Sequence, residues 1–100
     1  MSSYKVVSPS SEGQLIEQLE NMAKNHDHVS EVRVDDASSA IQLKLDGKAH
    51  FFGYPDVAIP VRKDKLNQAK EIVSRLERTI KSGTPPTREE AHALYETLAH

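Results

Sequence analysis

Residues 29–52 read VSEVRVDDASSAIQLKLDGKAHFF and carry the clearest strand pattern in the chain. Apolar and polar side chains alternate at 29–35 and again at 41–45, which is the pattern of strands with one buried face. Asp46 and Gly47 form a dipeptide favoured in type I′ hairpin turns, because both central positions of that turn need positive φ. The stretch therefore predicts antiparallel strands, with a hairpin at Asp46-Gly47 and a return strand over 48–52.

Further strand signals lie on both sides of this central stretch. Upstream, residues 4–7 form a short run rich in β-branched side chains, which predicts an edge strand. Downstream, apolar residues alternate again over 57–61, and Pro60 places that strand at an edge or near its own end.

Helical periodicity precedes the strands. Apolar side chains recur every three or four residues from 12 to 25 and predict an amphipathic helix. Ser11 and Gln14 have the spacing of a capping box, in which the two side chains satisfy backbone N–H groups at the start of a helix.

Two more helices are expected after the strands. The first begins at the N-cap candidate Asp64 and ends before Gly83, a residue type favoured just past helix ends. Its apolar seam over 66–80 either packs on the sheet of the same chain or pairs with a second copy. Thr87 and Glu90 form another capping box, which opens the last helix.

The order of elements predicts an α+β fold of the two-layer sandwich type. We expect β-α-β-β-β-(β)-α-α, with helices covering a small, mostly antiparallel sheet of about three to five strands. A chain of 100 residues has the size of a single compact domain, over 1–100.

Composition narrows the chemistry. The chain has no cysteine, which excludes disulfides, thiolate zinc sites and cysteine nucleophiles. Its net charge is −2, so no global charge points to nucleic acid. The first residues lack the apolar stretch of a signal peptide, and no run is long enough for a membrane span. We expect a cytoplasmic protein without a cofactor and without contact with a membrane.

Three of the five aromatic residues, Phe51, Phe52 and Tyr54, fall within four positions and precede Pro55. Neighbouring residues of a strand point to opposite faces, so Phe51 and Phe52 cannot both enter one core layer. These four residues are our candidate contact site for a protein partner, because aromatic side chains often anchor interfaces. In the alternative interpretation, one Phe fills the core and the other packs under the turn.

A basic strip runs along the helix predicted over 64–82. Helical spacing aligns side chains that include no acid, namely Lys63, Asn67, Lys70, Ser74, Arg78 and Lys81. Binding of nucleic acid, RNA in particular, through Lys63, Lys70, Arg78 and Lys81 is the alternative function, because such cations release counterions from a polyanion. A solvated outer face of an amphipathic helix would have the same composition.

A helix, a sheet and a basic second helix in this order resemble the layout of double-stranded RNA-binding domains. Those domains open the second helix with a loop rich in glycine and lysine that grips phosphate. The matching residues here, 58–65, contain no glycine. The resemblance is therefore one of layout alone.

Histidines supply the remaining candidate chemistry. His26 and His28, with Asp35 and Asp36, have ligand types suited to zinc or iron. A polar turn after a helix explains the same residues, and we predict no metal site. An enzyme that uses His50 or His92 is a further alternative. We expect a non-enzymatic regulatory or protein-interaction domain, a homodimer, which acts through a sheet edge and the aromatic turn.

Overall fold

The computed structural model describes residues 4–99 and contains four strands and three helices in that range. The strands are β1 (Lys5–Val6), β2 (Val29–Asp35), β3 (Ala40–Leu45) and β4 (Asp56–Pro60). The helices are α1 (Glu12–Lys24), α2 (Leu66–Lys81) and α3 (Arg88–Thr97). Two single turns of 3₁₀ helix, η1 (His26–His28) and η2 (Lys63–Lys65), precede β2 and α2.

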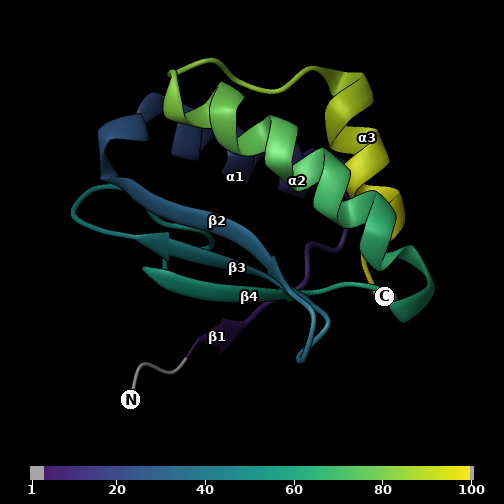
Figure 1. The fold of residues 1–100 in the computed structure, drawn as a ribbon. Helices are drawn as coiled ribbons and strands as arrows, with labels where there is room; N and C mark the ends of the chain where they lie inside the picture. The colour runs from purple at the N-terminus through teal and green to yellow at the C-terminus, as the bar shows by residue number, and fades with distance from the viewer. Residues whose placement is uncertain (1–3, 100) are drawn as a thin grey trace.

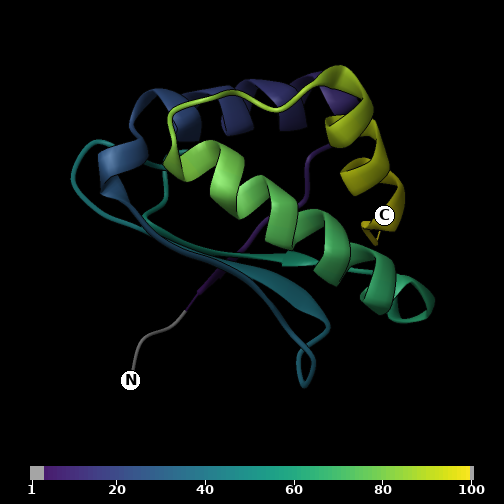
Figure 2. The same cartoon turned by 45° about the horizontal axis from the view of Figure 1, so that its top comes forward.

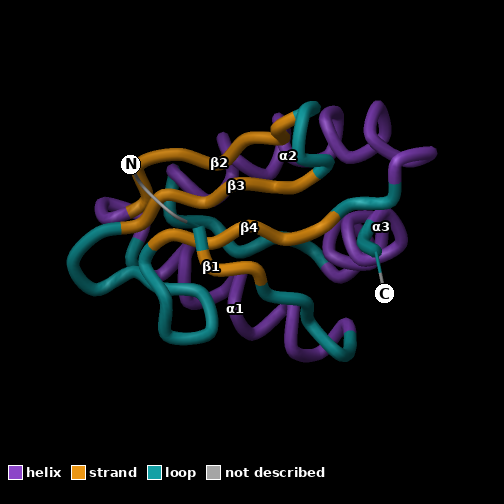
Figure 3. The backbone as a smooth tube through the Cα atoms, turned by 90° about the horizontal axis from the view of Figure 1, so that it is seen from below, coloured by secondary structure: helices purple, strands orange, loops and turns teal. Residues whose placement is uncertain are grey.

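The strands form one mixed sheet in the order β1-β4-β3-β2. β2, β3 and β4 are antiparallel neighbours, whereas β1 runs parallel to β4. Leu43 in the centre of β3 lies opposite Val32 on one side and Val57 on the other. β1 and β2 are therefore the two edges of the sheet (Figure 3).

All three helices lie on the same face of this sheet (Figures 1 and 2). α2 lies over β2, and α3 packs beside both α1 and α2. The predicted α+β fold, with one helical layer over a mostly antiparallel sheet, is confirmed. The predicted element order is confirmed as well, without the optional extra strand.

The core lies between the two layers and is mainly aliphatic. Strand side chains such as Ile41, Leu43 and Val57 face the helices and are at most 2% exposed. The alternate positions of the strands, such as Arg33 and Lys44, are exposed on the uncovered face of the sheet. Alternation in the sequence thus decides which face of each strand is covered.

The seam of α2 is used inside the molecule. Ala69, Val73, Leu76 and Ile80 are buried in the core shared with the sheet. The sequence left open whether this seam pairs with a second copy, and its burial contradicts that use. No helix within residues 4–99 combines the length and the apolar character that crossing a membrane requires.

Helix ends follow the predicted capping chemistry in full at two of four places and in part at a third. At the start of α1, Ser11 Oγ accepts a hydrogen bond from Gln14 N at 3.2 Å, but Gln14 Oε1 accepts from Ser10 N, so only half of the predicted capping box forms. Thr87 and Glu90 form both halves of the capping box of α3, at 3.1 and 2.9 Å. Gly83 follows α2 with φ of +85°. Asp64, in contrast, is no N-cap: it lies in η2 and accepts a hydrogen bond from Arg62.

The hairpin predicted at Asp46-Gly47 is wrong, and residues 48–52 are not a strand. Asp46 N instead continues the pairing with β2 through His28 O at 2.8 Å, and its carboxylate contacts His28 and Ser30. The chain then crosses to β4 through a loop over 46–55. Two buried residues of this loop, Ala49 and Phe51, extend the core beyond the end of β3.

Candidate functional site

The aromatic turn has the geometry of a tight hairpin. Phe51 and Tyr54 exchange backbone hydrogen bonds of 3.0 and 3.1 Å, and Phe52 and Gly53 between them have φ of +51° and +84°. Two positive φ values are the signature of a type I′ turn. The tight hairpin turn therefore lies at Phe52-Gly53, and not at Asp46-Gly47 where the sequence predicted it.

Phe51 belongs to the core and not to a contact surface. Its side chain is 0% exposed, and it packs edge to face against Phe52, with ring centroids 5.1 Å apart. Phe52 is half-buried beside the same core. We therefore remove Phe51 from the candidate site, because its side chain cannot contact a partner. The alternative interpretation, in which one of the two rings fills the core, holds for Phe51.

Phe52 is held in a left-handed backbone conformation that side chains other than glycine rarely adopt. Such a conformation costs about 1–2 kcal/mol. The backbone N–H of Phe52 donates to Gln18 Oε1 on α1 at 2.7 Å. This bond and the packed ring hold the turn against α1, so the turn presents the next exposed ring from a fixed position.

Tyr54 provides that exposed ring, at the edge of the sheet formed by β1. Its side chain is 40% exposed, and the Lys5 ammonium of β1 lies 5.2 Å from the ring centroid, within the range of a cation–π contact. A hollow of about 260 Å³ opens beside the pair. The hollow, called here the β1 hollow, is lined by Tyr4, Lys5, Tyr54, Pro55 and Asp56.

A second exposed apolar side chain lies on the same edge. Val6 of β1 is 64% exposed, and only Val6 and Tyr54 are large hydrophobic residues with exposed side chains in the part of the chain that the structure describes. β1 pairs with β4 on one side, and no other strand among residues 4–99 pairs with its outer side. Backbone groups of an unpaired edge are available to a further strand.

The basic strip is exposed but partly neutralised. Lys70 Nζ lies 2.6 Å from Asp36 Oδ1, and Lys81 Nζ lies 3.6 Å from Glu77 Oε2. Lys63, in η2, and Arg78, in the last turn of α2, are exposed as well. The structure therefore exposes all four cations, three on α2 and Lys63 before it, while two of the four already contact an acid.

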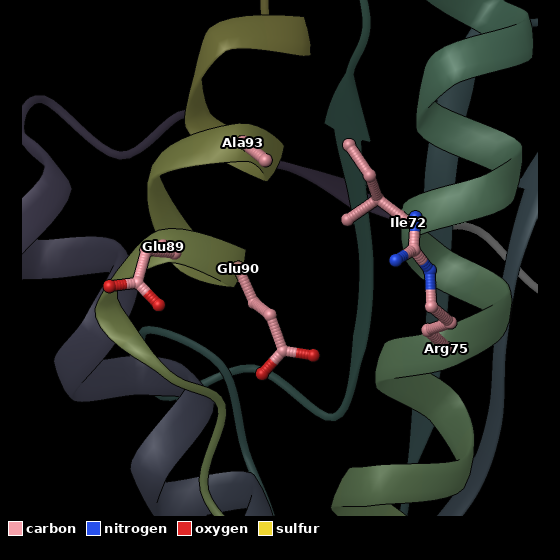
Figure 4. A pocket seen from close by; sticks show the side chains of 5 residues that line it. All are labelled: Ile72, Arg75, Glu89, Glu90 and Ala93. Atoms are coloured by element: carbon pink, nitrogen blue, oxygen red, sulfur yellow. The ribbon is translucent and has the colours of Figure 1, made fainter.

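A smaller hollow lies between α2 and α3 (Figure 4). It measures about 200 Å³ and is lined by Ile72, Arg75, Glu89, Glu90 and Ala93. Figure 4 shows Glu90 extending from α3 toward the gap, while Glu89 points away from it. Because the Glu90 carboxylate accepts the hydrogen bond of Thr87 N, its role is explained by the helix cap.

The histidines do not form a site together. His28 Nδ1 lies 3.0 Å from Asp46 Oδ1, and His26 Nδ1 lies 3.3 Å from Ala23 O. His92 contacts Glu12 and, at 3.5 Å, Glu96. His50 is exposed in the loop over 46–55. Within residues 4–99, no three side chains of the metal-ligating types gather closely enough to hold an ion.

Lys5 and Val6 were absent from the sequence-based site, although the sequence marks them as part of an edge strand. The pairing of β1 with β4, more than fifty positions away, is not visible in the local sequence, and it is this pairing that places β1 beside Tyr54.

Comparison of the chain with protein-family models, with curated proteins and with solved structures finds no match. The candidate site therefore rests on geometry alone.

Proposed function

We propose that this protein is a non-enzymatic protein-interaction domain that binds an extended segment of a partner at the β1 edge. The observation that carries the proposal is the coincidence, at one unpaired edge, of Val6, Tyr54 and the β1 hollow. An extended peptide can add to such an edge through backbone hydrogen bonds, and side-chain pockets then give specificity.

The side chains at this edge indicate what kind of peptide fits. Tyr54 and Pro55 form a rigid apolar wall, and rings of this kind are common anchors of interfaces. The Lys5 ammonium beside the ring favours an acidic group on the peptide. We therefore expect a segment that carries an apolar residue close to an aspartate or glutamate.

The test selects peptides of this kind from a displayed library and measures their affinity by fluorescence anisotropy. Tyr54→Ala should weaken binding by about tenfold or more, because truncation of an interface anchor typically costs more than 1 kcal/mol. The control variant, Lys63→Glu with Arg78→Glu, alters two exposed cations, one in η2 and one in α2, and should leave peptide affinity within about twofold.

The same variants also test the alternative function, which is nucleic-acid binding through the basic strip. Protein purified with and without nuclease treatment is compared for bound nucleic acid. If nucleic acid co-purifies and the charge-reversed control loses it, while Tyr54→Ala changes nothing, the proposal is contradicted. Peptide binding that maps to Tyr4–Val6 and to residues 54–56 by NMR chemical shifts would support it.

A further inference from the structure

The second edge of the sheet, β2, differs from the β1 edge in length and in charge. β2 spans Val29–Asp35, whereas β1 is only two residues long. Within the described residues, β2 pairs with β3 on one side only. A hollow of about 240 Å³ follows this edge between β2 and α2, lined by Val32, Arg33, Val34, Lys70, Val73, Ser74 and Glu77.

Charges alternate in sign along the uncovered face of β2. Glu31, Arg33 and Asp35 occupy every second position, so their side chains share one face. Arg33 now pairs with both neighbours, 3.1 Å from Glu31 and 3.6 Å from Asp35. Val32 lies between Glu31 and Arg33, faces the core side and is the middle residue of the strand.

We propose that two copies of this chain pair through β2, antiparallel, with Val32 on the two-fold axis. In this register Glu31 lies opposite Arg33 of the second copy, and Arg33 lies opposite the second copy's Glu31. Opposite charges directly across an antiparallel pair are stabilising, and like charges are destabilising. Val32 lies at the centre of the strand, and the charged pairs beside it lie on the regular part of β2, after the register shift between Val29 and Glu31.

Charge complementarity selects this register over the neighbouring one. An axis through Arg33 would place Arg33 opposite itself and Glu31 opposite Asp35, so every facing pair of charged side chains would repel. Registers shifted by one residue would put core-side residues opposite residues of the uncovered face. An axis through Val34 pairs Arg33 with Asp35 but extends past the end of the strand into the turn that follows Asp35.

The side of α2 that lies along the β2 edge also carries charges of opposite sign at its two ends. Lys70, Ser74 and Glu77 line the hollow at spacings of four and three, with a cation at one end and an acid at the other. α2 runs opposite to β2, as Figure 1 shows, and Lys70 near the start of α2 accordingly contacts Asp36 after the end of β2, at 2.6 Å. A two-fold axis reverses the direction of the second helix, so the Lys70 end of one α2 lies toward the Glu77 end of the other.

The first test is the oligomeric state, measured by sedimentation equilibrium over a concentration series. The unaltered chain should dimerise, and Arg33→Glu should raise the dimer dissociation constant by about tenfold or more, because symmetry creates two repelling pairs. The double exchange Glu31→Arg with Arg33→Glu recreates both attractive pairs and should restore dimerisation. Lys5→Glu, on the opposite edge, serves as the matched control and should leave the dissociation constant unchanged.

A cross-linking experiment tests the register. The chain has no cysteine, so a single introduced cysteine can form a disulfide only between copies. Val32→Cys should form a covalent dimer on oxidation faster than Gln42→Cys, whose position lies on the interior strand β3. Circular dichroism confirms that each variant is folded. A monomer at every concentration, failure of the folded double exchange to dimerise, or equal cross-linking rates would each overturn the proposal.

Discussion

At the scale of single residues, Phe52 shows how the surroundings hold a conformation that the residue itself disfavours. Its φ of +51° is one that glycine adopts freely and phenylalanine does not. The ring packs on Phe51, and the backbone N–H donates to Gln18. Burial of the ring and this bond together offset the backbone cost.

This strain predicts an inverted order of stability for two truncations. Phe52→Ala and Phe52→Gly both remove the ring, but only glycine also relieves the left-handed backbone. The glycine variant should therefore be more stable than the alanine variant by about 1 kcal/mol. In ordinary helix or strand positions glycine is the less stable of the two. Urea unfolding of both variants measures the difference, and an alanine variant of equal or greater stability would contradict the strain.

Asp35 predicts a dependence of stability on pH. Its carboxylate accepts hydrogen bonds from the Ser38 hydroxyl at 2.6 Å and from Ser38 N at 3.0 Å. These two bonds hold the pKa of Asp35 below the ordinary value of 3.8, and the charge of Arg33 makes a smaller contribution in the same direction. A lowered pKa favours folding at pH values above the unfolded pKa, and this contribution disappears as pH falls through the folded pKa.

Removal of the Ser38 hydroxyl should therefore lower the stability of the folded chain only while Asp35 is ionised. Ser38→Ala should raise the pKa of Asp35 toward its ordinary value, as followed by NMR titration of the carboxyl carbon. The stability difference between this variant and the unaltered chain, measured by urea unfolding, should be larger near pH 6 than near pH 2. A difference independent of pH would contradict the assigned role of Ser38.

At the scale of elements, the sequence predicted what depends on nearest neighbours. Alternation placed β2 within its observed bounds, and the capping box of Thr87 and Glu90 placed the start of α3. Both signals act over a few residues and need no knowledge of the rest of the chain. Asp64 failed as an N-cap because η2 begins one residue before it, so the helix proper starts later at Leu66.

The prediction for the connection between β3 and β4 failed because contacts with residues outside this connection decide its conformation. Asp46 and Gly47 have the local preference for a hairpin, but His28 and Ser30 bind the Asp46 carboxylate and keep the chain beside β2. Phe51 is buried in the core, and Phe52 N donates a hydrogen bond to Gln18 of α1, so the loop lies against α1 where it turns. The aromatic residues were found from their clustering, whereas their division into core and surface depends on these long-range contacts.

At the scale of the whole molecule, the two edges of the sheet have different characters. The β1 edge is short and carries the apolar Val6 and Tyr54, whereas the β2 edge is long and carries alternating charges. β3 and β4 separate them, so the edges are about 14 Å apart at 4.8 Å per strand spacing. Surfaces at this separation that share no residue are expected to act independently.

Together the two proposals predict bivalent binding. Pairing through β2 would give one continuous sheet of eight strands, since each copy contributes four. Its two β1 edges would then lie about 34 Å apart, at seven spacings of 4.8 Å. A flexible linker of about 40 residues has an average span of that length, so a tandem of two selected peptides joined by such a linker can reach both sites.

The tandem should bind the unaltered chain more tightly than a single peptide by about a hundredfold, because the second contact forms at a high effective concentration. Arg33→Glu separates the copies, so it should remove this advantage and leave the affinity for a single peptide unchanged. Tyr54→Ala should instead weaken both peptides while the dimer persists. Isothermal titration calorimetry provides both affinities and stoichiometries. If Arg33→Glu also weakens the single peptide, the peptide site is not at the β1 edge of one chain, and the independence of the two edges is contradicted.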